Sequence, residues 1–207
     1  MPFFNTAFPG LVIFQPVIFH DERGYFCETY NEKSFQLNGI QAHFVQDNES
    51  KSKYGVVRGL HFQKGDAAQA KLVRASEGTV IDIVVDIRKG SPTYGKYFSI
   101  ELSNENHLQF FVPRGFAHGF VVVSQTAVFN YKCDNFYNKE ADGGIQILDP
   151  SLDIEIPVDK NKIFFSEKDS NQPLLAETDH GFIYNADEYK NWQADEIPST
   201  FSIQSSI

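Results

Sequence analysis

Cysteine, basic charge and long apolar runs are all scarce in this sequence, and each scarcity excludes a class of protein. The two cysteines, Cys27 and Cys133, are far apart and form no Cys-x-x-Cys motif, so we expect buried thiols in a reducing compartment. The N-terminal segment, MPFFNTAFPG, lacks the basic region and the apolar core of a signal peptide. No apolar run approaches the ~20 residues needed to cross a bilayer. The sequence therefore predicts a cytoplasmic protein with no membrane partner.

The net charge limits the partners further. The chain carries 18 Lys and Arg against 27 Asp and Glu, which gives a formal net charge of -9. Because no basic cluster could neutralise phosphates along a duplex, we expect no nucleic-acid partner. A small anionic ligand stays open, since a few basic residues can converge locally.

Short apolar segments separated by turn residues predict a fold built from strands. We expect strands over residues 11–19, 25–30, 44–50, 71–75, 79–88, 97–103, 108–113 and 127–133. They recur about every ten residues between Gly, Pro, Asn and Ser turns, which is typical of an antiparallel sandwich or barrel. The one helical segment that we expect covers residues 31–39, capped by Asn31 and ended by Gly39.

The segment TVIDIVVDIR, residues 79–88, places its isoleucines and Val85 on one side and Asp82 and Asp86 on the other. We expect one side to pack on the core and the other to be at least partly polar. After Tyr131 the pattern loosens, with a short strand at residues 154–157. The polar composition from about residue 176 onward predicts one domain over 1–175 and an extension over 176–207 of unknown role, packed on the surface or at an interface.

One histidine and one arginine stand inside the apolar stretch GVVRGLHFQ. Taken alone, His61 fits a core histidine satisfied by a backbone carbonyl. Its neighbours favour a cavity instead, because Arg58 lies three residues earlier and Lys71 opens the next strand. Gln46 and Asn48 share one side of the preceding strand. Burying so many polar groups in one sheet is costly unless they line a cavity.

Such a lining suits abstraction of a proton next to a carbonyl group. His61 would take the proton, and a cation would stabilise the enolate oxygen. Tyr131 could return a proton to the opposite face if it lies across the cavity, although Tyr131 and Tyr137 also fit core rings with a hydroxyl at the rim. Asp169 fits either a solvated charge beside Lys168 or a carboxylate that fixes the tautomer of His61.

A metal site is the alternative for a small β-barrel that contains histidines. Such sites usually have a His-x-His pair on one strand. Here Phe62 and Gln63 follow His61, so the pair is absent. The segment PRGFAH, which ends at His118, supplies only the later half of a metal-barrel pattern, and we expect no metal.

Several motifs in consistent order resemble the dTDP-4-dehydrorhamnose 3,5-epimerase family. They are RG at 23–24, QDN at 46–48, RGLHFQ at 58–63, AQAKLV at 68–73, VDIR at 85–88, SPTYG at 91–95, PRGFAHGF at 113–120, YK at 131–132, DP at 149–150 and SEKD at 166–169. Together they span roughly residues 11–175 and are far more specific than one motif. The resemblance implies an antiparallel, cupin-like jelly-roll β-barrel with a few short helices and a homodimer. It also implies epimerisation of dTDP-4-keto-6-deoxyglucose, without metal or cofactor, on the way to dTDP-L-rhamnose.

The resemblance also implies roles for individual residues. His61 matches the family's base, Asp169 its partner, Tyr131 its acid, and Lys71 the lysine near the keto oxygen. The substrate-binding positions that it implies are Arg23, Phe26, Glu28, Gln46, Asp47, Asn48, Arg58, His118, Tyr137, Asp142 and Lys168. Arg23, Phe26 and Glu28 resemble residues lent across the dimer interface, and Tyr137 resembles a ring that stacks on thymine.

The chain departs from the family in two places and leaves alternatives open. Residues 64–68 lack the prolines expected there, and the tail beyond residue 175 is longer than is typical. One alternative is a homologue that inverts a single carbon or moves the keto group between positions 3 and 4; such ketoisomerases tend to carry a second histidine where Gln63 stands. Another is a non-catalytic cupin that binds sugar nucleotides. The third is a metal-dependent cupin oxygenase.

Overall fold

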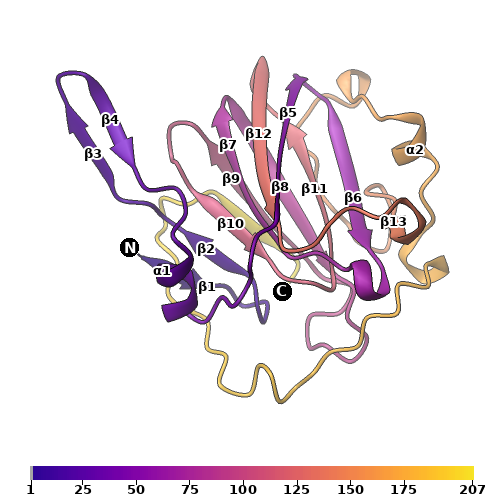
Figure 1. Ribbon diagram of the computed structural model, residues 1–207. Helices are drawn as coiled ribbons and strands as arrows, with labels where there is room; N and C mark the ends of the chain where they lie inside the picture. Colours follow the sequence, from indigo (N-terminus) through magenta and orange to yellow (C-terminus); the bar gives the residue numbers. More distant parts are fainter. Residues whose placement is uncertain (1) are drawn as a thin grey trace.

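Two six-stranded sheets form the body of the protein in the computed structural model, which describes residues 2–207 (Figure 1). The first sheet has the order β1 (Phe3–Asn5), β2 (Val12–Phe14), β10 (Gln109–Val112), β7 (Lys71–Glu77), β12 (Thr126–Cys133) and β5 (Gln46–Lys53). The second has the order β13 (Asp142–Gly144), β6 (Val57–Gln63), β11 (Phe116–Val122), β8 (Thr79–Asp86), β9 (Tyr97–Ser103) and β14 (Ile203–Ser205).

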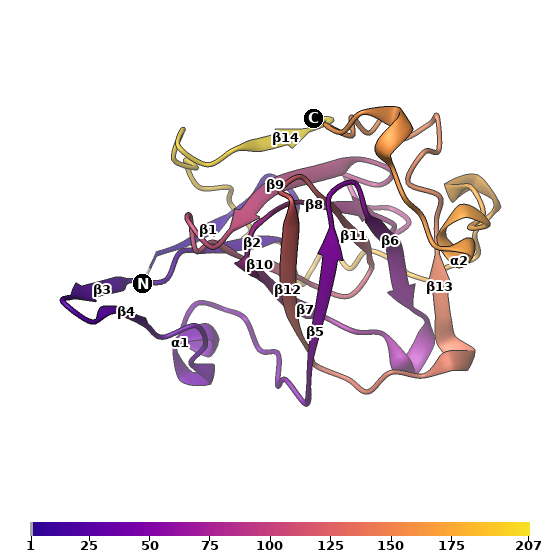
Figure 2. The same ribbon diagram turned by 90° about the horizontal axis from the view of Figure 1, so that it is seen from above.

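All strand pairs within the two sheets are antiparallel. Viewed from above, the sheets wrap around a common interior (Figure 2). The predicted antiparallel, cupin-like jelly roll is therefore confirmed.

The alternating pattern of the strands builds the interior between the sheets. Along β12, Ala127, Phe129 and Cys133 are buried, with at most 1% of their surface exposed. Phe129 stacks on Phe120 of the opposite sheet, with ring centroids 4.2 Å apart. Such cross-sheet aromatic contacts add to the burial of apolar area that holds the two layers together.

Strand β8 is buried on both faces. Val80 and Val84 belong to the interior cluster, whereas Ile83 and Val85 pack in a second cluster on the outer face of their sheet. The side that carries Asp82 is therefore not solvated, and Asp82 has no exposed surface. The sequence correctly predicted which residues share each side of β8. The side that carries Asp82 was expected to be partly polar, but it is fully buried.

The predicted first helix is confirmed as α1 (Glu32–Leu37). It begins after Asn31, whose side chain accepts a hydrogen bond from the backbone N–H of Ser34 at 3.2 Å. Its buried residue is Phe35, which packs against Phe14 beneath the first sheet. The remaining helical elements are short: η1 (Gly65–Ala67), η2 (Lys139–Ala141), η3 (Lys160–Lys162), α2 (Glu167–Ser170) and η4 (Leu175–Glu177).

The strand expected over residues 11–19 is divided in two. Pro16 lies between β2 and β3 (Ile18–Asp21), and β3 pairs with β4 (Gly24–Cys27) instead of joining either main sheet. Proline lacks the N–H needed to continue a ladder, which explains the break. The β3–β4 hairpin projects from the body at the upper left of Figure 1. The short strand expected at residues 154–157 was wrong, because this segment has no regular structure.

Residues 178–207 cross the barrel as a strap, passing beneath it in Figure 1. The indole Nε1–H of Trp192 donates to the carbonyl oxygen of Thr6 at 2.9 Å. Phe201 packs edge-on against Phe4, with centroids 5.5 Å apart, and β14 then pairs with β9. The strap thus ties the N-terminal strand of one sheet to the last strand of the other. No helix among residues 2–207 has the length and hydropathy to span a membrane.

Candidate active site

A cavity of about 480 Å³ opens between the two sheets. The second sheet contributes His61 from β6 and His118 from β11 to its lining, and the first contributes Lys71 from β7 and Tyr131 from β12. Helix α2 adds Asp169 on the outside of β6. The structure therefore brings together all four residues for which a catalytic role was expected.

Two glycines allow β6 and β11 to approach closely beside the two histidines. Gly59 has φ +117°, and a Cβ placed on it would lie 2.6 Å from the Cα of Gly119. The ladder between the strands pairs His118 with His61 and shifts register just beyond His118. Only glycine tolerates both this backbone conformation and this approach, so the two residues fix how the histidines enter the cavity.

His61 and Asp169 form a hydrogen-bonded pair. Nε2 of His61 lies 2.5 Å from Oδ1 of Asp169, whose other oxygen accepts from the hydroxyl of Ser166 at 2.8 Å. Ser166 also caps α2 by accepting from the backbone N–H of Asp169 at 3.0 Å. Burial acts to raise the pKa of Asp169, but the hydrogen bonds from His61 and Ser166 outweigh it and leave that pKa below its usual value. Asp169 is therefore a carboxylate that can orient the ring.

Burial shifts the pKa values of both Lys71 and Tyr131 toward the neutral form of the side chain. Burial lowers the pKa of Lys71, opposed by nearby acidic groups that include Asp82. Burial raises the pKa of Tyr131, with Arg58 opposing it. The phenol of Tyr131 consequently keeps its proton at neutral pH and can donate it.

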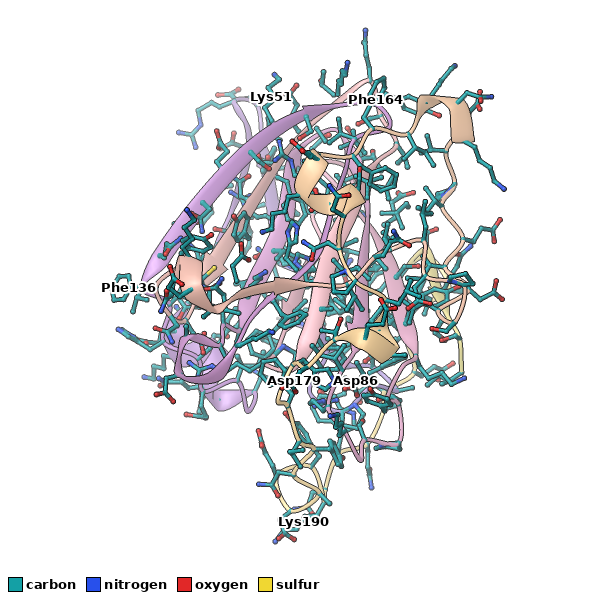
Figure 3. All side chains as sticks on the ribbon, turned by 90° about the vertical axis from the view of Figure 1, so that its right-hand side faces the viewer. Lys51, Asp86, Phe136, Phe164, Asp179 and Lys190 are labelled. Carbon is teal, nitrogen blue, oxygen red and sulfur yellow. The ribbon has the colours of Figure 1, made fainter. Side chains whose placement is uncertain are left out.

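A neighbouring hollow of about 360 Å³ extends this cavity. It shares His61, Lys71, Tyr131 and Lys168 with the first and adds the following predicted binding residues: Gln46, Asn48, Tyr137 and Asp142. Nζ of Lys168 lies 2.5 Å from a carboxylate oxygen of Asp142, to which the Tyr137 hydroxyl also donates at 3.2 Å. Figure 3 looks at this side of the molecule, with Phe164 at its upper edge and Phe136 at its left edge.

Four predicted binding residues lie elsewhere. The side chain of Asp47 points away from His61 and forms an ion pair with Lys132 at 2.6 Å, because alternate residues of β5 face opposite sides. Arg23 and Phe26 lie on the β3–β4 hairpin and Glu28 directly after it, and none of the three lines the cavity of His61.

Arg58 lines the cavity, where its Nε–H donates to the hydroxyl of Ser52 at 3.1 Å.

Sequence reasoning assigned no role to two groups that support the site. Ser166 positions Asp169, and its signals were the SEKD motif and its place three residues before that aspartate, a common capping arrangement. Asp82 accepts from Nε2–H of His118, with distances of 3.1 and 2.9 Å to its two oxygens. Its signal was a single acid in a run of valine and isoleucine. Within residues 2–207, no group of three or more His, Cys, Asp or Glu side chains is arranged to hold a metal ion.

Known proteins of similar sequence belong to one enzyme family. A family model described as dTDP-4-dehydrorhamnose 3,5-epimerase matches residues 5–177. The dTDP-4-dehydrorhamnose 3,5-epimerase of Methanothermobacter thermautotrophicus is 48% identical over 176 residues, which cover 84% of this chain and 95% of that protein.

Two crystal structures show the same fold. The dTDP-4-dehydrorhamnose 3,5-epimerase of Elizabethkingia anophelis has a TM-score of 0.82 and 55% identity, covering 86% of this chain and 97% of its own. The dTDP-6-deoxy-D-glucose-3,5-epimerase of Legionella pneumophila, in complex with dTDP-4-keto-L-rhamnose, has a TM-score of 0.85 and 44% identity, covering 89% of this chain and 99% of its own. The chain belongs to the dTDP-4-dehydrorhamnose 3,5-epimerase family.

Proposed function

We propose that this protein converts dTDP-4-dehydro-6-deoxy-D-glucose to dTDP-4-dehydro-L-rhamnose by inverting carbons 3 and 5, the neighbours of the 4-keto group. The observation that carries the proposal is the His61–Asp169 pair in a cavity that Lys71 and Tyr131 line from the opposite sheet. Inversion of a stereocentre needs a base on one face and an acid on the other. The cavity offers both.

The base in this mechanism is His61. Asp169 accepts a hydrogen bond from Nε2–H, which leaves Nδ1 of the ring free to take a proton from the substrate. Removing a proton next to the keto group places negative charge on its oxygen, and Lys71 and His118 line the cavity where that charge would be stabilised. Tyr131 returns a proton to the opposite face at carbon 5, and at carbon 3 the opposite face takes its proton from solvent. No step requires a metal or a cofactor.

The remaining cavity residues bind the nucleotide part of the substrate. Arg58 and Lys168 supply positive charge for the diphosphate, and Gln46 and Asn48 supply amides for hydrogen bonds. Tyr137 is 55% exposed at the rim, where its ring can stack on thymine. Asp142 holds both Tyr137 and Lys168 in place through its hydrogen bonds. Asp47 takes part only if its side chain leaves Lys132.

A second copy of the chain completes the site in this proposal. The β3–β4 hairpin exposes Phe19, Tyr25 and Phe26, which are 61%, 57% and 68% accessible, well away from the barrel core. Apolar rings gathered on a projecting hairpin indicate a protein partner. In a homodimer this hairpin would bring Arg23, Phe26 and Glu28 to the nucleotide of the other subunit.

Two further properties belong to the proposal. Residues 1–175 form the catalytic domain, and residues 176–207, which include the strap, are an extension, since the family model ends at residue 177. Cys27 and Cys133 are both free thiols, which suits a reducing compartment such as the cytoplasm.

The direct test is the structure of the product. We expect NMR of the product formed from dTDP-4-dehydro-6-deoxy-D-glucose to show inversion at both carbons. Inversion at one carbon alone would indicate a single-carbon epimerase, a keto group at carbon 3 would indicate a ketoisomerase, and binding without turnover would indicate a non-catalytic sugar-nucleotide-binding protein. Each of these three results would contradict the proposal.

A further inference from the structure

A carboxylate lies buried directly behind the cavity. Asp82 has no exposed surface, and its strand neighbours on the same side, Val80 and Val84, belong to the apolar interior. Its side chain has one hydrogen-bonding partner among residues 2–207, the Nε2 of His118, at 2.9 and 3.1 Å from the two oxygens. A buried carboxylate with one donor is costly for stability, so a purely structural role explains it poorly.

The contact determines what His118 presents to the cavity. With Nε2–H donated to Asp82, the opposite ring nitrogen, Nδ1, has no partner within residues 2–207 and belongs to a side chain that lines the cavity. The ring is 7% exposed, stacked toward Phe129, and therefore has little freedom to turn. Asp82 thus fixes both the tautomer and the direction of the ring.

Asp82 also acts on Lys71. Burial lowers the pKa of Lys71, and the charge of Asp82 is among the effects that raise it. The titratable and charged groups around Lys71 are Tyr131 and Cys133 on β12, Arg58 and His61 on β6, Asp82 on β8, His118 on β11, Asp142 on β13, and Lys168 and Asp169 on α2.

Few of these groups carry negative charge at neutral pH. Burial raises the pKa of Cys133 to about 11, so its thiol is neutral. Asp142 already pairs with Lys168 at 2.5 Å. Asp169 pairs with His61. Among these groups Asp82 is therefore the acid that has neither Lys168 nor His61 as a partner. Burial raises the pKa of Asp82 above its usual range, and the contacts with His118 and Lys71, which favour the carboxylate, oppose this shift only in part.

We propose that Asp82 is a positioning residue of the reaction. It holds the ring of His118 through Nε2–H, and its buried negative charge favours the protonated form of Lys71. His118 and Lys71 are then oriented and charged to stabilise an enolate oxygen. This rests on the proposed function, in which both side chains face the 4-keto oxygen. Asp82 does not touch the substrate and acts through the two residues that do.

The substitution that tests this is Asp82→Asn, which keeps an oxygen that can accept from Nε2–H but removes the charge. We expect kcat to fall by about 10- to 100-fold, the size of effect found when a partner behind a reacting group is removed, with KM within about 3-fold. We also expect unchanged affinity for dTDP, because the nucleotide contacts are intact. The matched control is Asp86→Asn, which removes a buried carboxylate of the same strand that pairs with Arg88 instead. Its folded fraction should retain the kcat of the parent within about 3-fold.

The pH profile separates positioning from a structural defect. In this proposal we expect activity to fall at alkaline pH as Lys71 loses its proton. Removing the charge of Asp82 lowers the pKa of Lys71 further, so the alkaline limb of kcat moves to lower pH in Asp82→Asn and stays in place in Asp86→Asn. An unchanged limb, or a kcat within about 3-fold of the parent, would overturn the proposal.

A second measurement uses the unaltered protein and is independent of how Asp82→Asn folds. In ¹H–¹⁵N spectra of the histidine rings, with His118 assigned by its absence in His118→Gln, we expect Nε2 to carry hydrogen throughout pH 6 to 9. An Nε2 without hydrogen would mean that Asp82 is the donor, and the proposal would be wrong. If the parent fails to turn over the substrate, the proposed function fails, while these spectra still decide the contact between Asp82 and His118.

Discussion

Nε2 of His61 lies 2.5 Å from Oδ1 of Asp169, although 108 residues separate the two in the sequence. His61 is fixed in the middle of β6, and Asp169 is fixed by the single turn of α2 that Ser166 caps. The proposed base and the carboxylate proposed to orient it are therefore held by two separate elements. Activity should depend on both residues, but in different ways.

Asp169→Asn should lower kcat by about 10²-fold or more, because the neutral amide cannot stabilise the positive charge that the ring of His61 gains when it takes a proton from the substrate. Steady-state kinetics at pH 7 measure this, with Asp187→Asn in the exposed strap as control. A kcat within about 3-fold of the parent would remove Asp169 from the mechanism.

The same variant has a signature in stability. The pKa of Asp169 is lower in the folded protein than its usual 3.8, so this carboxylate stabilises the fold above that pH and the contribution is lost as the pH falls through the lowered value. Denaturant unfolding of parent and Asp169→Asn should therefore differ by a constant free energy above about pH 5, with the difference shrinking below about pH 4. A difference that grows on acidification would contradict the assigned direction.

Tyr131→Phe should separate exchange from inversion. The variant keeps His61 and the cavity, so substrate hydrogens can still exchange with solvent, but the proton donor for carbon 5 is missing. We expect deuterium to enter from heavy water while NMR shows no inversion at carbon 5. Tyr94→Phe is the matched control, because Tyr94 lies in the turn before β9. Full inversion by Tyr131→Phe would assign the acid to another group.

Phe26→Ala tests the homodimer. Phe26 is 68% exposed on the projecting hairpin, and its burial against a partner would contribute about 1.5–3 kcal/mol. We expect sedimentation to show a weaker dimer and calorimetry to show weaker dTDP binding. Leu148→Ala, at a residue that is 52% exposed elsewhere, should change neither. A monomeric parent with full activity would contradict the shared site.

Phe201→Ala tests the strap. Phe201 is 8% exposed and packs on Phe4, so its truncation should lower the free energy of unfolding by about 3 kcal/mol. Urea unfolding measures this loss, and kcat should stay within about 3-fold because the ring is not among the residues that line the cavity. Ile207→Ala, at a residue that is 58% exposed, should leave stability unchanged. A large loss of kcat in Phe201→Ala would mean that the strap supports the site directly.

The antiparallel fold could be predicted because turn residues punctuate the strands regularly. The break at Pro16 was missed for a physical reason: the apolar run continues through the proline, and only the tertiary fold shows that β2 and β3 go to different sheets. The strand β1 was missed because it pairs with β2 over three residues only. The strand β14 was missed because its partner is β9, with Ile203 opposite Ile100, far earlier in the chain. Local sequence carries no record of such contacts.

The convergence of His61, Lys71 and Tyr131 could be predicted because polar groups in apolar strands need a cavity. That Asp169 reaches His61 was predicted through the family resemblance, since a four-residue helix leaves no periodic signal. The contact of Asp82 with His118 was not predicted, because alternation shows which side of β8 a residue faces but not what lies there. Asp47 was expected to bind substrate, and its side chain faces the other side of β5. The roles themselves remain predictions.

The central claim is that His61 removes protons next to the keto group. The most direct measurement is deuterium incorporation from heavy water into dTDP-4-dehydro-6-deoxy-D-glucose, followed by NMR with the parent, with His61→Ala, and with His43→Ala at an exposed ring paired to Glu32. We predict incorporation by the parent and His43→Ala, and a rate at least about 10²-fold lower for His61→Ala. Exchange by His61→Ala at the rate of the parent would show that another group is the base.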